Sequence, residues 1–170
     1  MIFTKRSDYG LRAAMELAAG YGYGPLSARQ IAQRGDLPEP FVRKLLQQLA
    51  QARLAGSARG RHGGYVLARD PAQITVRETL EAFETLAPVP CLDPANLPQA
   101  SDATIANDGE TTAGEEACTL DIPEFSCPTR AAWRLVDRKV RATLETVTLS
   151  DLLQEVQHHG LTAEMIHAPS

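Results

Sequence analysis

The stretch "SARQIAQRGDLPEP", residues 27–40, and its continuation "FVRKLLQQLAQARLAG", residues 41–56, decide the fold. Ser27 and Gln30 have the spacing of a capping box, in which each side chain bonds a backbone N–H group of the other residue. A helix is therefore expected to begin here and to stop near Gly35. After the prolines at 38 and 40, apolar residues at helical spacing predict a second helix: Phe41, Leu45, Leu46, Leu49 and Leu54. Two short helices joined by "RGDLPEP" predict a helix-turn-helix.

The next segment, "SARGRHGGYVLARDP" (residues 57–71), predicts a β-hairpin. Its "YVLA" run is strand-like, and Asp70-Pro71 closes it. Adjacent glycines at 63 and 64 permit the positive φ values that a tight hairpin turn requires. A helix-turn-helix followed by a hairpin is a winged helix, so the expected fold class is mainly α with a small β-hairpin wing.

Further helices are expected on both sides of this core. Residues 5–20 are amphipathic, and Thr75 with Glu78 forms a second capping box that begins a helix over residues 76–86. A long helix is predicted over 130–147 and a short one over 149–156. The expected organisation is a winged-helix domain (1–86), an acidic and partly disordered cysteine-bearing loop (87–127), a dimerisation helix with a short C-terminal helix (128–156) and a tail (157–170).

Charge is distributed unevenly along the chain. Residues 1–77 carry 12 Lys and Arg against 5 Asp and Glu, whereas residues 78–129 carry 11 acidic residues and no Lys or Arg. This asymmetry suggests nucleic-acid contact by the first part, although basic residues also form ordinary solvated faces. No apolar run is long enough to span a membrane and the first residues lack a signal-peptide pattern, so we expect a cytoplasmic protein.

The winged helix predicts where DNA would bind. The second helix of a helix-turn-helix enters the major groove with the residues near its N-terminus. Those residues are Glu39, Pro40, Arg43 and Lys44, of which Arg43 is expected to contact a base directly. Phosphate contacts are expected from Lys5, Arg29 and Lys44. The wing is expected to reach the minor groove or phosphates with Arg59, Arg61, His62, Gly63 and Gly64.

The helix over 130–147 has more apolar surface than a small domain would bury. Its apolar face comprises Trp133, Val136, Val140 and Leu144. The natural partner is the same helix of a second subunit, which gives a two-fold homodimer suited to a palindromic double-stranded DNA operator. The alternative is that this helix packs on its own domain.

Several stretches together resemble the iron–sulfur winged-helix transcriptional regulators of bacteria, the Rrf-type family that includes IscR, NsrR and RirA. They are "MIFTKRSDYGLRAAMELA", "IAQRGDLPEPFVRKLLQQLAQARL", "RGRHGGYVLARDP", "ITVRETLEAFE" and "CPTRAAWRLVDRKVRATLETVTLSDL". The resemblance covers about residues 1–86 and 127–156. It implies a homodimeric transcription factor, most often a repressor, whose operator binding responds to redox state, iron or nitric oxide.

Three cysteines in a reducing compartment suggest a metal site, a cluster, redox chemistry or no special role. The resemblance implies that Cys91, Cys118 and Cys127 hold an iron–sulfur cluster, either 2Fe–2S or 4Fe–4S. Cys127 matches the family by its "CPTRAAW" context, and Cys91 by its place after "LEAFETL". The gaps of 26 and 8 residues between the three cysteines exceed those usual in the family. Loop closure entropy tolerates such an insertion, since each doubling of length costs about 0.6 kcal/mol.

The resemblance also bears on the fourth ligand. Regulators resembling IscR have a histidine three residues after the last cysteine, where this chain has Arg130, which cannot ligate. Those resembling NsrR use an Asp near the N-terminus of the other subunit, and Asp8 in "RSDYGLR" matches it. The resemblance therefore implies a site of three cysteines and Asp8 from the partner subunit. Alternatively, Asp8 is a helix cap or first-turn acid.

Other functions remain open at this level. A cluster-free regulator of the same fold could switch by oxidation of its cysteine thiols, or use neither device. A protein-interaction module is a more distant alternative. An enzyme or iron–sulfur carrier is not expected, because the sequence shows no nucleophile–base pair, CxxC or phosphate-binding loop.

Overall fold

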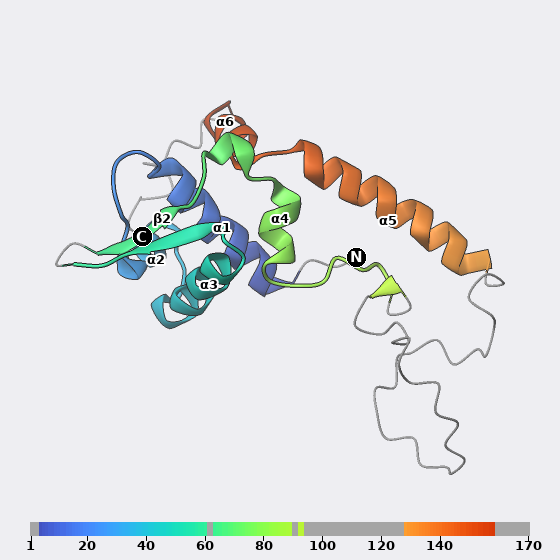
Figure 1. The fold of residues 1–170 in the computed structure, drawn as a ribbon, viewed down its shortest axis with the longest axis horizontal. Helices are drawn as coiled ribbons and strands as arrows, with labels where there is room; N and C mark the ends of the chain where they lie inside the picture. Colours follow the sequence, from blue (N-terminus) through green and yellow to red (C-terminus); the bar gives the residue numbers. More distant parts are fainter. Residues whose placement is uncertain (1–3, 61–62, 90–91, 94–127, 159–170) are drawn as a thin grey trace, which may run out of the picture. The chain divides into compact units, whose positions relative to one another are not determined.

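A computed structural model describes residues 4–60, 63–89, 92–93 and 128–158. Their elements, in chain order, are α1 (Lys5–Ala19), α2 (Ala28–Arg34), α3 (Glu39–Gln51), β1 (Ala55–Ala58), β2 (Gly64–Leu67), the short 3-10 helix η1 (Pro71–Gln73), α4 (Val76–Glu81), α5 (Pro128–Thr146) and α6 (Leu149–His158). The chain forms two compact units, residues 2–84 with 141–170 and residue 1 with 85–140. We call the first the winged-helix unit. The predicted fold class is confirmed: helices dominate, and the two strands form one antiparallel hairpin (Figure 1).

Helix α1 is the centre of the winged-helix unit. Thr4 caps its first turn by accepting a hydrogen bond from the backbone N–H of Ser7 at 3.3 Å. Its buried face carries Gly10, Ala13 and Ala14, small enough to admit close neighbours, and Leu17, which fills the core between them. As a result α1 packs against α2, α3, α4, α6 and β2. The sequence predicts this helix but not its central place.

Each helix of the helix-turn-helix, α2 and α3, ends in a specific turn that the sequence analysis did not predict. The predicted capping box of Ser27 and Gln30 is confirmed at the start of α2. At the end of α2 the left-handed residue is Asp36 (φ 49°) rather than Gly35, and the N–H of Leu37 bonds the carbonyl of Ala32 at 2.9 Å. This is a Schellman ending, in which the apolar residue after the left-handed one folds back onto the helix.

Helix α3 ends in the same way. Arg53 is left-handed (φ 60°), and the N–H of Leu54 bonds the carbonyl of Leu49 at 2.9 Å. The prediction that Leu54 continues the helical face was therefore wrong, because this leucine is the apolar residue of the turn and enters the core from outside the helix. The turn also redirects the chain straight into β1.

The core of the winged-helix unit joins residues from both ends of the chain. Its fully buried side chains include Ile31, Leu45, Leu46, Leu49 and Leu149. Leu149, at the start of α6, also donates its backbone N–H to the carbonyl of Ile74 at 3.0 Å. A C-terminal helix thus completes the domain that the N-terminal sequence begins, an arrangement that the sequence analysis did not predict.

Helix α4 is shorter than predicted. Its capping box of Thr75 and Glu78 is confirmed, but the helix ends at Glu81 instead of continuing through residue 86. A turn follows, in which the N–H of Phe83 bonds the carbonyl of Leu80 at 3.0 Å. The buried ring of Phe83 then covers Gly10 of α1 so closely that a Cβ atom on that glycine would overlap it. Packing on α1 has overridden the helical pattern.

The hairpin pairs β1 with β2 in the register Ala55↔Leu67 to Ala58↔Gly64 (Figure 1). The predicted reason for its glycines was wrong: positive φ occurs at Gly60 (130°) and not at Gly63 or Gly64. Those two glycines instead allow close backbone approach. A Cβ atom on Gly64 would overlap the carbonyl oxygen of Leu26, whose backbone exchanges hydrogen bonds of 3.0 and 2.8 Å with Tyr65.

A group of four charged residues joins α4 to the last turns of α5 within the winged-helix unit. Arg77 bonds Glu81 at 3.1 Å and Glu145 at 2.9 Å, and Arg141 bonds Glu81 at 2.7 Å. The hydrogen bond with Glu81, reinforced by Glu145, raises the pKa of Arg77 despite some desolvation. Backbone bonding continues the connection, since the N–H of Val76 reaches the carbonyl of Val147 at 2.8 Å.

Candidate nucleic-acid interface

Helix α3 presents a polar face opposite its buried one. Val42, Leu45, Leu46 and Leu49 face the core. The exposed positions follow the same helical spacing on the other side: Pro40, Arg43, Lys44, Gln47 and Gln51. A rigid helix with such a face has the form and chemistry that the major groove accepts, because arginine, lysine and glutamine all bond base edges or phosphates.

Glu39 and Arg43 do not act independently in the free protein. The Arg43 guanidinium bonds the Glu39 carboxylate at 2.6 Å, one turn earlier on α3. The pair is exposed, so it adds little stability, but it neutralises the arginine that the sequence suggests as a base contact. A base contact from Arg43 would have to be made alongside this pairing or replace it.

The residues predicted to contact phosphates are differently placed. Lys5, Arg29 and Lys44 lie exposed at the start of α1, on α2 and on α3. None of the three forms a salt bridge within the part of the chain that the structure describes. Their charge is therefore uncompensated by a direct partner, which suits contact with an anionic backbone.

The wing is only partly described. Arg59 is exposed after β1, whereas Arg61 and His62 lie outside the described residues. Gly63 and Gly64 are half-buried. Gly63 lies against the backbone of Ala58 and Gly60 within the hairpin, and Gly64 lies against the segment before α2. Their role as DNA contacts stays a prediction.

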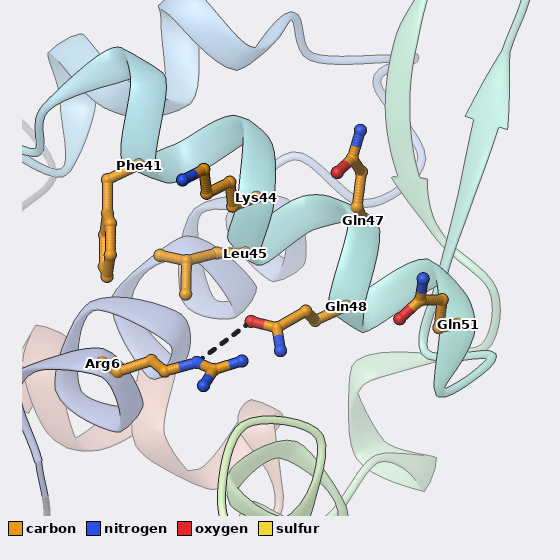
Figure 2. Close-up of a pocket in the computed structure, with 7 residues that line it drawn as sticks. All are labelled: Arg6, Phe41, Lys44, Leu45, Gln47, Gln48 and Gln51. Atoms are coloured by element: carbon orange, nitrogen blue, oxygen red, sulfur yellow. Dashed lines mark hydrogen bonds between the residues drawn. The ribbon is translucent and has the colours of Figure 1, made fainter.

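Sequence reasoning missed a hollow between α1 and α3, which Figure 2 shows in close-up. Arg6 of α1 reaches across it, and its Nε donates a hydrogen bond to Oε1 of Gln48 at 3.2 Å. The spacing of Lys44, Gln47, Gln48 and Gln51 was the available signal, because these positions line one side of a helix. Arg6 gave no such signal, since only the fold brings it to α3.

Of the four residues implied as cluster ligands, only Asp8 is described; Cys91, Cys118 and Cys127 lie outside the described residues. Thr4, not Asp8, is the cap of α1, and Asp8 is its first-turn acid. The Asp8 side chain is 52% exposed and pairs with Arg12 at 3.3 Å. The carboxylate is therefore accessible from outside its own subunit, and its role as a cluster ligand stays a prediction.

The predicted dimerisation face lies on α5. Trp133 and Val136 are 40% and 44% exposed, and Val140 and Leu144 are half-buried. Leu135, 49% exposed, lies outside the predicted face and was missed. Exposed apolar side chains along one helix are available for association, and the dimer interface stays a prediction.

Comparison with known proteins shows that the chain is similar to transcriptional regulators. A family model described as an iron-dependent transcriptional regulator, Rrf2, matches residues 3–155. The protein rrf2 of Nitratidesulfovibrio vulgaris is 30% identical over 157 residues, covering 91% of this chain and 89% of that protein. Among solved structures, IscR of T. potens superposes with a TM-score of 0.63 at 26% identity, covering 92% and 88% of the two chains. CymR, the global cysteine regulator of B. subtilis, gives 0.63 at 28% identity, covering 91% and 98%. No helix in the described residues is long and apolar enough to cross a membrane.

Proposed function

Because this chain belongs to the Rrf2 family of transcriptional regulators, we propose that it is a cytoplasmic homodimeric repressor of a palindromic DNA operator. The family consists of regulators and not enzymes. The observation that carries the proposal is the exposed polar face of α3, placed in the winged-helix unit with Lys5, Arg29 and Lys44, which form no salt bridge among the described residues. Along the sequence, negative charge is concentrated after this basic part, in residues 78–129, which contain no Lys or Arg.

In this proposal α3 enters the major groove. Arg43, oriented by Glu39, would read a base edge there, while Lys5, Arg29 and Lys44 would hold the phosphate backbone. Arg59, with Arg61 and His62, would contact the minor groove or the adjacent phosphates. The apolar face of α5, with Trp133 and Val136, would bury itself against its copy in the second subunit, and this two-fold symmetry requires two related half-sites.

For the signal we propose an iron–sulfur cluster. Cys91, Cys118 and Cys127 of one subunit, with Asp8 of the partner subunit, would hold it, and its oxidation or loss would supply the response to redox state, iron or nitric oxide. A carboxylate binds iron less firmly than a thiolate, which suits a sensor that must give up its cluster. The similarity to IscR supports a cluster but not its fourth ligand, which rests on the match of Asp8 to regulators resembling NsrR. The alternative is a cluster-free switch by oxidation of the cysteine thiols, since the chain is as similar in structure to CymR, the global cysteine regulator, as it is to IscR.

DNA binding is tested with a duplex that the purified protein selects from a randomised library. The proposal predicts a selected sequence with two inverted half-sites. It also predicts that the logarithm of the association constant falls linearly with the logarithm of the salt concentration, because each neutralised phosphate releases counterions. Arg59→Ala should weaken binding to all sequences alike. A flat salt response of the wild type would refute the DNA-binding function.

The cluster is tested by the visible spectrum of protein purified without oxygen. We expect a coloured wild type, a bleached Cys127→Ala variant and an unstable chromophore in Asp8→Asn. Asp36→Asn is the matched control, because Asp36 is another exposed carboxylate of the same unit and asparagine tolerates its left-handed backbone. A colourless wild type, with DNA binding that responds to thiol oxidants, would favour the alternative switch.

A further inference from the structure

An open hollow of about 390 Å³ separates the first turn of α1 from the polar side of α3 (Figure 2). It lies wholly within the winged-helix unit. Its polar lining consists of one arginine, one lysine and three glutamines, namely Arg6, Lys44, Gln47, Gln48 and Gln51. Phe41 and Leu45 supply the apolar part. No carboxylate is among these lining residues, so the hollow favours an anion.

Arg6 is held in a defined place but keeps its bonding capacity. Its Nε bonds Gln48 at 3.2 Å, while its two terminal nitrogens have no hydrogen-bond or salt-bridge partner within the described residues. Lys44 has no salt-bridge partner there either. Guanidinium groups with free terminal nitrogens bind phosphate oxygens in pairs, and lysine adds a point charge.

We propose that this hollow receives one phosphate of the operator backbone, with Arg6 and Lys44 as its cationic contacts and Gln48 as the positioning residue for Arg6. The inference rests on the proposed DNA-binding function and deepens it. The exposure of the residues that line the hollow favours a backbone phosphate over a small free anion. Lys44, Gln47 and Gln51 are all exposed, so the hollow opens onto the same surface as the predicted base contacts. Sites for small molecules usually bury most of their ligand.

The test is the salt dependence of affinity for the selected duplex. The slope of log K against log salt is negative, and removing one phosphate contact lowers it, that is, makes it shallower, by about one. Arg6→Ala should therefore lower this slope by about one, which amounts to a roughly 3- to 4-fold change in its affinity ratio to wild type between 50 and 200 mM salt. Arg6→Lys should keep the slope, since it keeps the charge. Gln48→Ala should lower affinity while leaving the slope unchanged, because the charge remains.

Controls separate the possible failures. Arg138→Ala removes one exposed positive charge from the other compact unit and should leave the slope unchanged; circular dichroism confirms that each variant is folded. If the wild type shows no salt-dependent binding, the proposed function itself fails. If it does, an unchanged slope in Arg6→Ala overturns the phosphate site alone. If Gln48→Ala lowers the slope as much as Arg6→Ala does, Arg6 acts by supporting α3 and not by contacting a phosphate. If inorganic phosphate binds in a way that depends on Arg6 while the slope for the duplex is the same in Arg6→Ala and wild type, the hollow is a free-anion site instead.

Discussion

Replacing Gly64 by alanine tests whether this glycine serves the protein's own packing. The added Cβ atom would overlap the backbone carbonyl of Leu26 and lie 3.0 Å from the backbone nitrogen of Ser27. Both obstacles are backbone, which cannot rotate aside as a side chain would. Relief therefore requires the hairpin to separate from the segment before α2. That movement stretches the two hydrogen bonds, 3.0 and 2.8 Å long, between Leu26 and Tyr65.

The magnitude follows from these contacts. Overpacking a close contact costs about 1–3 kcal/mol, and each weakened backbone hydrogen bond contributes about 1 kcal/mol. Because partial separation relieves the overlap while weakening the bonds, the two costs substitute for each other and do not add. We expect Gly64→Ala to lower the free energy of unfolding by about 2 kcal/mol, which for a chain of this size lowers Tm by about 4–8 °C.

The control is Gly56→Ala, a glycine of the other hairpin strand. A Cβ atom there would lie 3.8 Å from Cγ2 of Val66, an ordinary contact, so its free energy of unfolding should stay within about 0.5 kcal/mol of wild type. Urea denaturation followed by far-ultraviolet circular dichroism measures both variants. Equal stability of the two would refute the close-approach argument. A Gly64→Ala variant that kept full stability but lost DNA affinity would place this glycine at the DNA surface instead.

Two further predictions concern charged groups of the winged-helix unit. Glu81→Gln removes the carboxylate shared by Arg77 and Arg141, whose side chains are 30% and 23% exposed, and should lower the free energy of unfolding by about 0.5–1 kcal/mol at low salt. Because salt screens these ion pairs, urea titrations in 0.5 M sodium chloride should show a smaller loss of stability. A loss that does not depend on salt would contradict the reasoning. Partial burial alone would raise the pKa of Glu78, but hydrogen bonds from Thr75 and the charge of Arg69 hold it below its ordinary value, and hydrogen bonds from Thr148 likewise lower the pKa of Asp151. Both carboxylates bind protons more readily when unfolded, so their stabilisation is complete above about pH 5 and is lost as pH falls through the lower folded pKa values. A double variant, Glu78→Gln with Asp151→Asn, should lose less stability than wild type between pH 7 and pH 3.5 in urea titrations, and an equal loss would rule out these caps as the cause.

The sequence predicts the winged helix well because its signals are local. The capping boxes at Ser27 and Thr75 involve residues three apart, and the structure confirms both. A third cap, Thr148 with Asp151, has the same spacing but was missed, because aspartate replaces the usual glutamate. Patterns fail where distant contacts decide, as at the end of α4, where Phe83 leaves the helix to cover Gly10.

The same distinction explains the candidate interface. Arg43 and Lys44 could be predicted because their place on the second helix of a helix-turn-helix is enough to suggest a role. Arg6 could not, because 42 positions separate it from Gln48, and only the packing of α1 on α3 makes them neighbours. The pairing of Glu39 with Arg43 has the i, i+4 spacing that a helical sequence can show. That Arg6 and Lys44 have no carboxylate partner among the described residues can be seen only in the folded structure.

The first turn of α1 carries both the implied cluster ligand and the proposed phosphate contact. Thr4 caps it, Arg6 projects toward α3, and Asp8, two residues later, is the implied ligand to the partner subunit's cysteines. Since a helical turn moves as one body, a ligand bond at Asp8 would act on the backbone that carries Arg6. Loss of the signal at Asp8 would then alter the phosphate contact that Arg6 makes. This coupling predicts that Asp8→Asn changes the salt slope of DNA binding in wild type but not in an Arg6→Ala background; an identical change in both backgrounds would show that any effect of Asp8 reaches DNA by another route.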